Sequence, residues 1–165
     1  MARKEFPVTI QSLLLSIVIA LSLSLLLPGT ILADAGGGSR VQTVDPTFTR
    51  ANMAIQAKDW DKAIELLNTT VAHDMTNADA FNLLGYAERQ RGNLDAAFKH
   101  YERALALDPD HKGAHEYVGE AYLLTGNLPK AEEHLARLDK LCIFSCEEYR
   151  DLKEAIVVYK RTQAK

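Results

Sequence analysis

The hydrophobic positions between residues 78 and 111 recur every three or four residues, in two separate stretches. The positions concerned are Phe81, Leu84 and Ala87 in the first stretch, and Leu94, Ala97, Phe98, Tyr101 and Leu105 in the second. This spacing puts apolar side chains on one face of an α-helix. Gly92 and Asn93 separate the stretches, and both residue types tolerate the left-handed backbone in which many helices end. The pattern predicts two amphipathic helices joined by a tight turn.

The same arrangement occurs once before and once after this segment. The spacing is constant, because Ala63, Ala97 and Ala131 are equally far apart in the sequence. We call this distance the repeat interval, and it also relates Ala51, Gly85 and Gly119, and Leu67, Tyr101 and Leu135. A fixed interval of this kind, about 34 residues long, is the signature of a repeat architecture. One helix pair cannot bury its own apolar face, so stacked pairs must supply the core. We therefore expect an all-α solenoid of about three helix-turn-helix units, at 44–77, 78–111 and 112–145, rather than an ordinary helical bundle.

The middle unit carries the residues of a known family. In it, a large apolar residue, Leu-Gly, Ala, an aromatic, Ala and Pro stand at Phe81, Leu84, Gly85, Ala97, Tyr101, Ala104 and Pro109. In these residues the unit resembles the tetratricopeptide repeat (TPR). The first unit departs from the pattern, with Arg50 in place of leucine, Lys58 in place of glycine and Met75 in place of proline. The resemblance spans roughly residues 44 to 145 and implies a TPR protein that binds other polypeptides.

The N-terminal part of the chain contains a hydrophobic run made only of Leu, Ile, Val, Ala and Ser. Arg3 and Lys4 precede an apolar run over residues 13–27, and Ala33-Asp34-Ala35 forms a small-x-small cleavage pattern. These features predict a signal peptide at 1–35 and hence a periplasmic or secreted protein. The alternative is an uncleaved anchor in the inner membrane, with the rest of the chain facing the periplasm, because the run approaches the length of a membrane span. The glycine-rich residues 36–43 predict a flexible linker.

The last segment, 146–165, predicts a capping helix and a short tail. Lys153 stands one repeat interval after Gly119, where the other units have a small residue, and its side chain would block a further helix pair. Across 147–159, we expect the apolar residues to pack back on the third unit; they are Tyr149, Leu152, Ile156 and Tyr159. Acids at the start of this helix and bases at its end suit the helix dipole.

Cys142 and Cys146 lie four residues apart at the turn into the cap. In an oxidising compartment this pair predicts a disulfide bond, which would pin the cap with about 2 kcal/mol of stability. Two alternatives remain open: a thiol-redox protein or a metal-binding protein centred on these cysteines. A redox pair usually has two intervening residues instead of three, and no histidine or acidic ligand motif accompanies this pair.

The resemblance also implies a binding face, because in the family the first helix of each unit lines a concave groove. The predicted groove residues are Phe48, Asn52, Gln56, Asn82, Tyr86, Arg89, Gln90, Tyr117 and Glu120. Tyrosine and arginine are enriched in binding hot spots, which favours Tyr86, Arg89 and Tyr117. A solvated face with incidental aromatics is the alternative. Asn52 alone matches the set with which some relatives hold a peptide carboxylate, so that mode is not expected.

Nothing in the sequence requires catalysis. There is no phosphate-binding loop, nucleophile elbow or zinc motif, and the five histidines are scattered along the chain. The net charge of −3 without a basic stripe argues against nucleic-acid binding. We expect no cofactor, no metal and no enzymatic activity. The predicted function is a scaffold or assembly factor in the cell envelope that binds a partner polypeptide, and a solenoid this short leaves self-association open.

Overall fold

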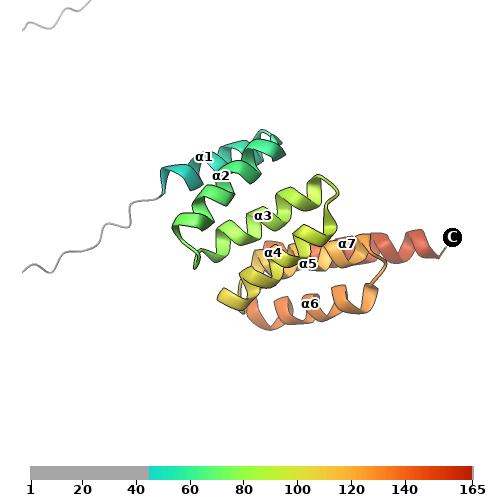
Figure 1. Cartoon of the computed structure of the whole chain (residues 1–165). Coiled ribbons are helices and arrows are strands. Elements are labelled where there is room, and N and C mark those ends of the chain that lie inside the picture. The colour runs from blue at the N-terminus through green and yellow to red at the C-terminus, as the bar shows by residue number, and fades with distance from the viewer. Residues whose placement is uncertain (1–44, 165) are drawn as a thin grey trace, which may run out of the picture. The chain divides into compact units, whose positions relative to one another are not determined.

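The computed structural model describes residues 45–164. The predicted signal peptide and the linker after it lie outside the described residues. Within residues 45–164 the chain is helical, without strands, and Figure 1 shows the helices following one another as stacked pairs. The helices are α1 (Pro46–Gln56), α2 (Trp60–His73), α3 (Ala78–Gln90), α4 (Leu94–Leu107), α5 (Lys112–Leu124), α6 (Leu128–Leu141) and α7 (Glu147–Gln163). The predicted all-α solenoid is confirmed.

Three hairpins form the solenoid: α1 with α2, α3 with α4, and α5 with α6. Neighbouring hairpins meet where α2 packs on α3 and α4 packs on α5, while α3 also contacts α5 directly. Several helices begin with a side-chain cap. Asp59 accepts from the backbone N–H of Lys62, and Asn77 accepts from that of Ala80. Each cap satisfies a backbone donor that the first helical turn leaves free.

The turn inside each hairpin uses a left-handed residue. Gly92, where the sequence predicts this conformation, adopts a φ of 81°, and Gly126, one repeat interval later, adopts a φ of 77°. In the first hairpin the equivalent residue is Lys58, which adopts φ 58° despite its side chain. This conformation costs a non-glycine residue about 1 kcal/mol. The first unit therefore keeps the turn geometry even where its sequence departs from the repeat pattern.

Gly85 and Gly119 occupy equivalent places, each seven residues after the start of its helix at Ala78 or Lys112. A methyl group on Gly85 would lie 2.5 Å from the ring of Tyr101, which belongs to the same hairpin. A methyl group on Gly119 would instead lie 2.6 Å from Leu152 of α7. The second glycine thus accommodates the cap and not its own hairpin partner.

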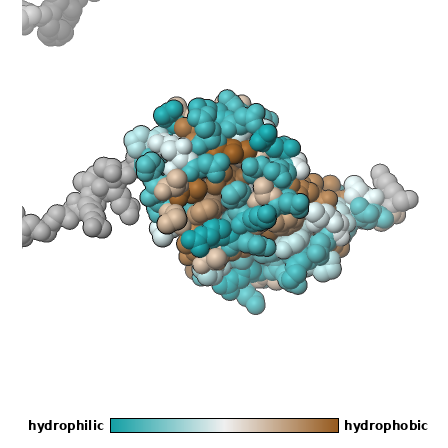
Figure 2. All heavy atoms as spheres, in the orientation of Figure 1, coloured by the Kyte–Doolittle hydropathy of each residue, from teal (hydrophilic) through white to brown (hydrophobic). Residues whose placement is uncertain are grey.

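The cap helix closes the core at the C-terminal end. Leu152 and Ile156 of α7 are buried in one cluster with Ala131 and Leu138 of α6, and Tyr149 packs against it. The helix extends to Gln163, past the predicted end at Tyr159. Lys153 is exposed on its outer side. In Figure 2 hydrophobic atoms remain visible beside the C-terminal end of α7, where Val157 and Val158 are exposed.

The turn into α7 contains the two cysteines. Their sulfur atoms lie at bonding distance, 2.00 Å, and their Cα atoms are 5.5 Å apart, within the range that a disulfide requires. Between them, Ile143 and Phe144 are almost fully exposed. Among the helices of residues 45–164, none combines the length and the hydrophobicity needed to span a membrane.

Candidate partner-binding face

The nine predicted groove residues all lie on the first helices of the three hairpins. Phe48, Asn52 and Gln56 lie on α1; Asn82, Tyr86, Arg89 and Gln90 lie on α3; Tyr117 and Glu120 lie on α5. We call these residues the first-helix face. The structure brings only some of them together, and whether they bind a partner stays a prediction.

Four of the nine form one cluster across α3 and α5. The Arg89 guanidinium pairs with the Glu120 carboxylate at 2.5 Å. It also lies 5.4 Å from the ring centre of Tyr86 and 5.5 Å from that of Tyr117. The two rings are themselves 4.8 Å apart. A cation that lies beside two aromatic rings and pairs with a carboxylate gains both cation–π and ion-pair energy. This Arg89 cluster therefore ties two consecutive hairpins together.

The Arg89 cluster is more buried than an open groove would require. The Arg89 side chain is 9% exposed and that of Glu120 is 25% exposed, while both tyrosines are half-buried. Trp60 of α2, which is not among the predicted groove residues, also belongs to this cluster: its ring meets that of Tyr86 edge-on at 5.8 Å. Trp60, Leu94 and Leu128 are one repeat interval apart, and this recurrence alone does not reveal a contact with the first-helix face.

The other members of the face are separate. Asn52 donates to the backbone carbonyl of Phe48 within α1, and Gln56 and Gln90 are exposed at the ends of their helices. Asn82 is only 5% exposed, and its Oδ1 atom finds no hydrogen-bond partner among the described residues. Its Nδ2 atom would lie 3.2 Å from a methyl group on Gly113, so α5 begins close against this side chain.

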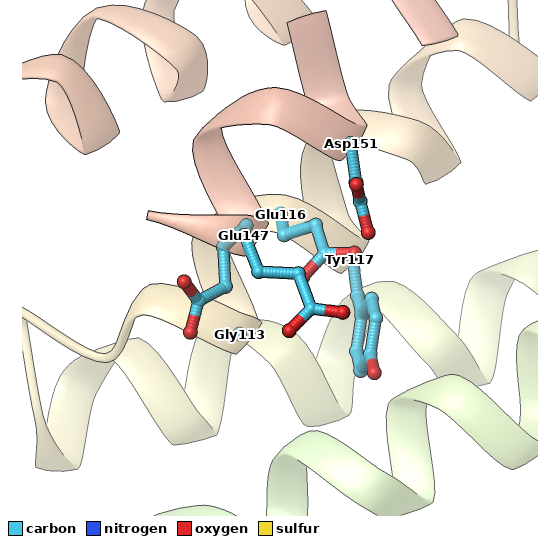
Figure 3. Close-up of a pocket in the computed structure, with 6 residues that line it drawn as sticks. Gly113, Glu116, Tyr117, Glu147 and Asp151 are labelled. Carbon is cyan, nitrogen blue, oxygen red and sulfur yellow. The ribbon is translucent and has the colours of Figure 1, made fainter. Parts of the chain in front are cut away.

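A pocket opens where the first-helix face meets the cap. It encloses about 270 Å³. It is lined by Gly113, Glu116 and Tyr117 of α5 and by Glu147, Glu148 and Asp151 of α7. Figure 3 shows the side chains of Glu116 and Asp151 reaching from the two helices into the same space. None of the lining residues is basic, so the pocket is strongly acidic.

Glu116 is the central acid of this pocket. Only 9% of the residue is exposed, and no hydrogen bond or ion pair within residues 45–164 reaches its carboxylate. Burial, reinforced by the charges of Glu120, Asp151 and Glu148, raises the pKa of Glu116 to about 8, against a smaller opposing effect of Arg89. Burial and the charge of Glu116 also raise the pKa of Tyr117 to about 12. The pocket thus holds an acid without an ion-pair partner, and this acid keeps its proton up to about pH 8.

The acids of α7 were predicted to favour the helix dipole and were not predicted to belong to a site. Asp151 follows Tyr117 by one repeat interval, so the register puts it on the continuation of the first-helix face. That register was the signal that could have revealed them. Their convergence on Glu116 depends on how α7 docks on α5, which the register alone does not specify.

Two histidines also meet, although their sequence positions suggested no contact. Nδ1 of His115 lies 2.8 Å from Nδ1 of His134, and Nε2 of His115 lies 3.0 Å from the Pro109 carbonyl oxygen. Burial lowers the pKa of both rings, that of His134 to about 4, so both are neutral at pH 7. Within the described residues no group of three or more His, Cys, Asp or Glu side chains is arranged to hold a metal ion.

Comparison with known proteins places the repeats in a family. One tetratricopeptide repeat family model matches residues 48–111, and a second, also described as tetratricopeptide repeat, matches residues 88–156. The DnaJ protein P58IPK homolog of Arabidopsis thaliana is 33% identical over 110 residues, 66% of this chain. The human protein O-mannosyl-transferase TMTC3 is 31% identical over 75 residues, 46% of this chain. The chain spans only 22% and 8% of the length of these two relatives.

Solved structures share the fold at low identity. The type III secretion translocator chaperone SycD of Yersinia enterocolitica superposes with a TM-score of 0.64 at 18% identity, covering 72% of this chain and 84% of SycD. The first TPR of Spaghetti (RPAP3), bound to the HSP90 peptide SRMEEVD, gives 0.61 at 18% identity, covering 72% of this chain and 91% of that one. Together with the constant repeat interval and the equivalent glycines, the two family-model matches show that the chain belongs to the tetratricopeptide repeat family.

Proposed function

We propose that this protein is a non-catalytic interaction module of the cell envelope, which binds a segment of a partner polypeptide along the first-helix face and acts as a scaffold or assembly factor. The TPR fold is typically a protein-binding module. The observation that carries the proposal is the Arg89 cluster beside the acidic pocket, because it sets two half-buried tyrosine rings next to an open polar recess. Aromatic anchors beside a polar recess are typical of peptide-binding sites.

Two solved neighbours support a polypeptide ligand. One is the Spaghetti repeat with its HSP90 peptide, and another is SycD in complex with a peptide of the translocator YopD. At this level of identity they support the class of ligand and not its sequence. The transferase and DnaJ relatives are far longer than this chain, and their names describe whole proteins.

Export is the second part of the proposal. It is supported by the basic start, the apolar run and the cleavage pattern of residues 1–35, together with the pairing of Cys142 and Cys146, since disulfides persist in oxidising compartments. N-terminal sequencing of the protein isolated from its own cells tests this part. A start near residue 36 is expected, whereas an intact N-terminus in the membrane fraction would favour the anchored assembly factor.

Photo-crosslinking tests the binding face. Benzoylphenylalanine is placed at Gln56 or Gln90, which are exposed at the ends of α1 and α3, and in matched controls at Lys99 or Glu102, which are exposed on α4. We expect irradiation in cells to join a discrete polypeptide to the first pair and not to the controls. Crosslinks from α4 alone, or equally from all four positions, would place the binding surface elsewhere.

A further inference from the structure

The two acids of α5, Glu116 and Glu120, have neighbours of different charge. Glu120 has a permanent counter-charge, because Arg89 pairs with it from α3. Glu116, one helical turn earlier, faces α7, where Glu148 and Asp151 carry the same sign of charge. The same helix therefore presents one acid that is neutralised within the fold and one that is not.

A buried carboxylate without a partner is costly, and further acids beside it raise that cost. The cost falls when a cation enters, because each charged hydrogen bond then forms in a partly desolvated space. The pocket offers such a cation the carboxylates of Glu116 and Asp151 from facing helices, with Glu147 and Glu148 at its rim. The ring of Tyr117 forms part of the wall and offers a cation–π contact.

We propose that the pocket between α5 and α7 is a specificity site that takes a lysine or arginine side chain of the bound polypeptide, with Glu116 as its principal anion. This inference rests on the proposed function, because the basic side chain belongs to the segment that lies along the first-helix face. The inference specifies one chemical property of that segment, a positive charge. The partner carries a basic residue at the end that reaches α7, beyond the position at which its backbone passes Tyr86 and Tyr117.

An organic cation fits this pocket better than a metal ion. The acidic groups of residues 45–164 include no set of three or more that is arranged to hold a metal. The volume of about 270 Å³ leaves room for a flexible side chain with its head group. Planar guanidinium groups also bind carboxylates with paired hydrogen bonds, which suits Glu116 and Asp151.

The test uses amide chemical shifts of the full-length protein labelled with ¹⁵N. The probes are N-acetyl-arginine amide and its neutral isostere N-acetyl-citrulline amide, at pH 8. We expect the arginine derivative to shift the amides around Glu116 and Asp151 in a saturable way, and the citrulline derivative to leave them in place. Glu116→Gln should weaken this binding by about tenfold or more. The control Glu102→Gln, an exposed acid on α4, changes the net charge equally and should bind as wild type.

Several outcomes would overturn the inference. They are equal shifts with citrulline, unchanged arginine binding by Glu116→Gln, and tighter binding of Ca²⁺ than of the arginine derivative at the same amides. Helical circular dichroism shows whether Glu116→Gln still folds. If it does not fold, Asp151→Asn is used as the test variant in its place. The proposed function is judged independently by crosslinking at Gln90. A partner that crosslinks there while arginine amide fails to bind would leave the function standing and remove this site.

Discussion

Helix α5 contacts α3 on one side and α7 on the other. The two contacts differ in whether the acidic side chain of α5 has an ion-pair partner. The α3 contact is closed: Arg89 pairs with Glu120 and lies beside the contacting rings of Tyr86 and Tyr117. The α7 contact leaves a pocket in which Glu116 faces Glu148 and Asp151 and has no ion-pair partner among the described residues. The difference teaches that the internal contact neutralises its acid with an ion pair, whereas the terminal contact leaves its acid without an ion-pair partner.

The repeat register makes the comparison residue by residue. Asn82 precedes Glu116 by one repeat interval, and Gly113 precedes Glu147 by the same interval. At the α3 contact a neutral amide packs against a glycine, which leaves little space. At the α7 contact Glu116 replaces the amide and Glu147 replaces the glycine, so the equivalent region becomes an acidic recess. Different residues at these equivalent positions thus separate a packed joint from a candidate site.

The largest predicted effect comes from a substitution that removes the ion pair of the α3 contact. Arg89→Met should lower the free energy of unfolding by about 3 kcal/mol, because it leaves the partly buried Glu120 carboxylate unpaired. Urea denaturation monitored by circular dichroism measures the change. The double variant Arg89→Met with Glu120→Gln should recover at least half of the loss. A loss below about 0.5 kcal/mol would show that the Arg89 cluster behaves like a surface ion pair.

The sequence predicted the scaffold of both contacts but not their difference. Small residues at Gly85 and Gly119, the turn glycines Gly92 and Gly126, and the basic residue Lys153 indicated three helix pairs and a cap. These signals are local or periodic, so a single chain reveals them.

The candidate site depends on side chains that meet across helices. The sequence placed Tyr86, Arg89 and Tyr117 on one face, yet it could not show that Arg89 is paired with Glu120. Nor could it show that Glu116 is buried beside Asp151, because a hydrophilic residue at a helical surface position is normally solvated. Hydrophobic periodicity assigns a residue to one face of its helix, whereas the burial of its side chain depends on the angle at which the next helix packs.

The second prediction concerns what holds α7 against α5. Replacing both Cys142 and Cys146 by serine should lower the free energy of unfolding by about 2 kcal/mol, the value expected for so short a closed loop. The loss should appear in the wild type on adding dithiothreitol and should not increase in the serine variant. Hydrogen exchange should quicken in α7 more than in α3, because only the terminal contact is pinned by the bond. Equal quickening in both helices would show that the bond stabilises the solenoid as a whole.

The smallest predicted effect is a pH dependence of stability. The contributions of Glu116 and of the histidine pair to the free energy of unfolding change in opposite directions with pH. The raised pKa of Glu116, caused by burial and by Glu120, Asp151 and Glu148, means that the folded state holds a proton that the unfolded state releases above about pH 4.5. The contribution of Glu116 to stability therefore falls as pH rises from about 4.5 to about 8. The lowered pKa values of buried His115 and His134 act in reverse, so their contribution falls as pH drops from about 6.5 towards 4.

The variant Glu116→Gln separates the two contributions, because it keeps both histidines and loses the carboxyl group. The difference in unfolding free energy, variant minus wild type, should be near zero at pH 5 and reach about 1.5 kcal/mol in favour of the variant at pH 8.5. Glu120→Gln is the matched comparison at the closed contact, and it should destabilise at both pH values because Arg89 loses its partner. A difference for Glu116→Gln that does not change with pH would mean that the α7 contact, like the α3 contact, already neutralises its acid. A gain in stability together with a loss of arginine binding would instead identify Glu116 as a residue retained for its ligand at the expense of the fold.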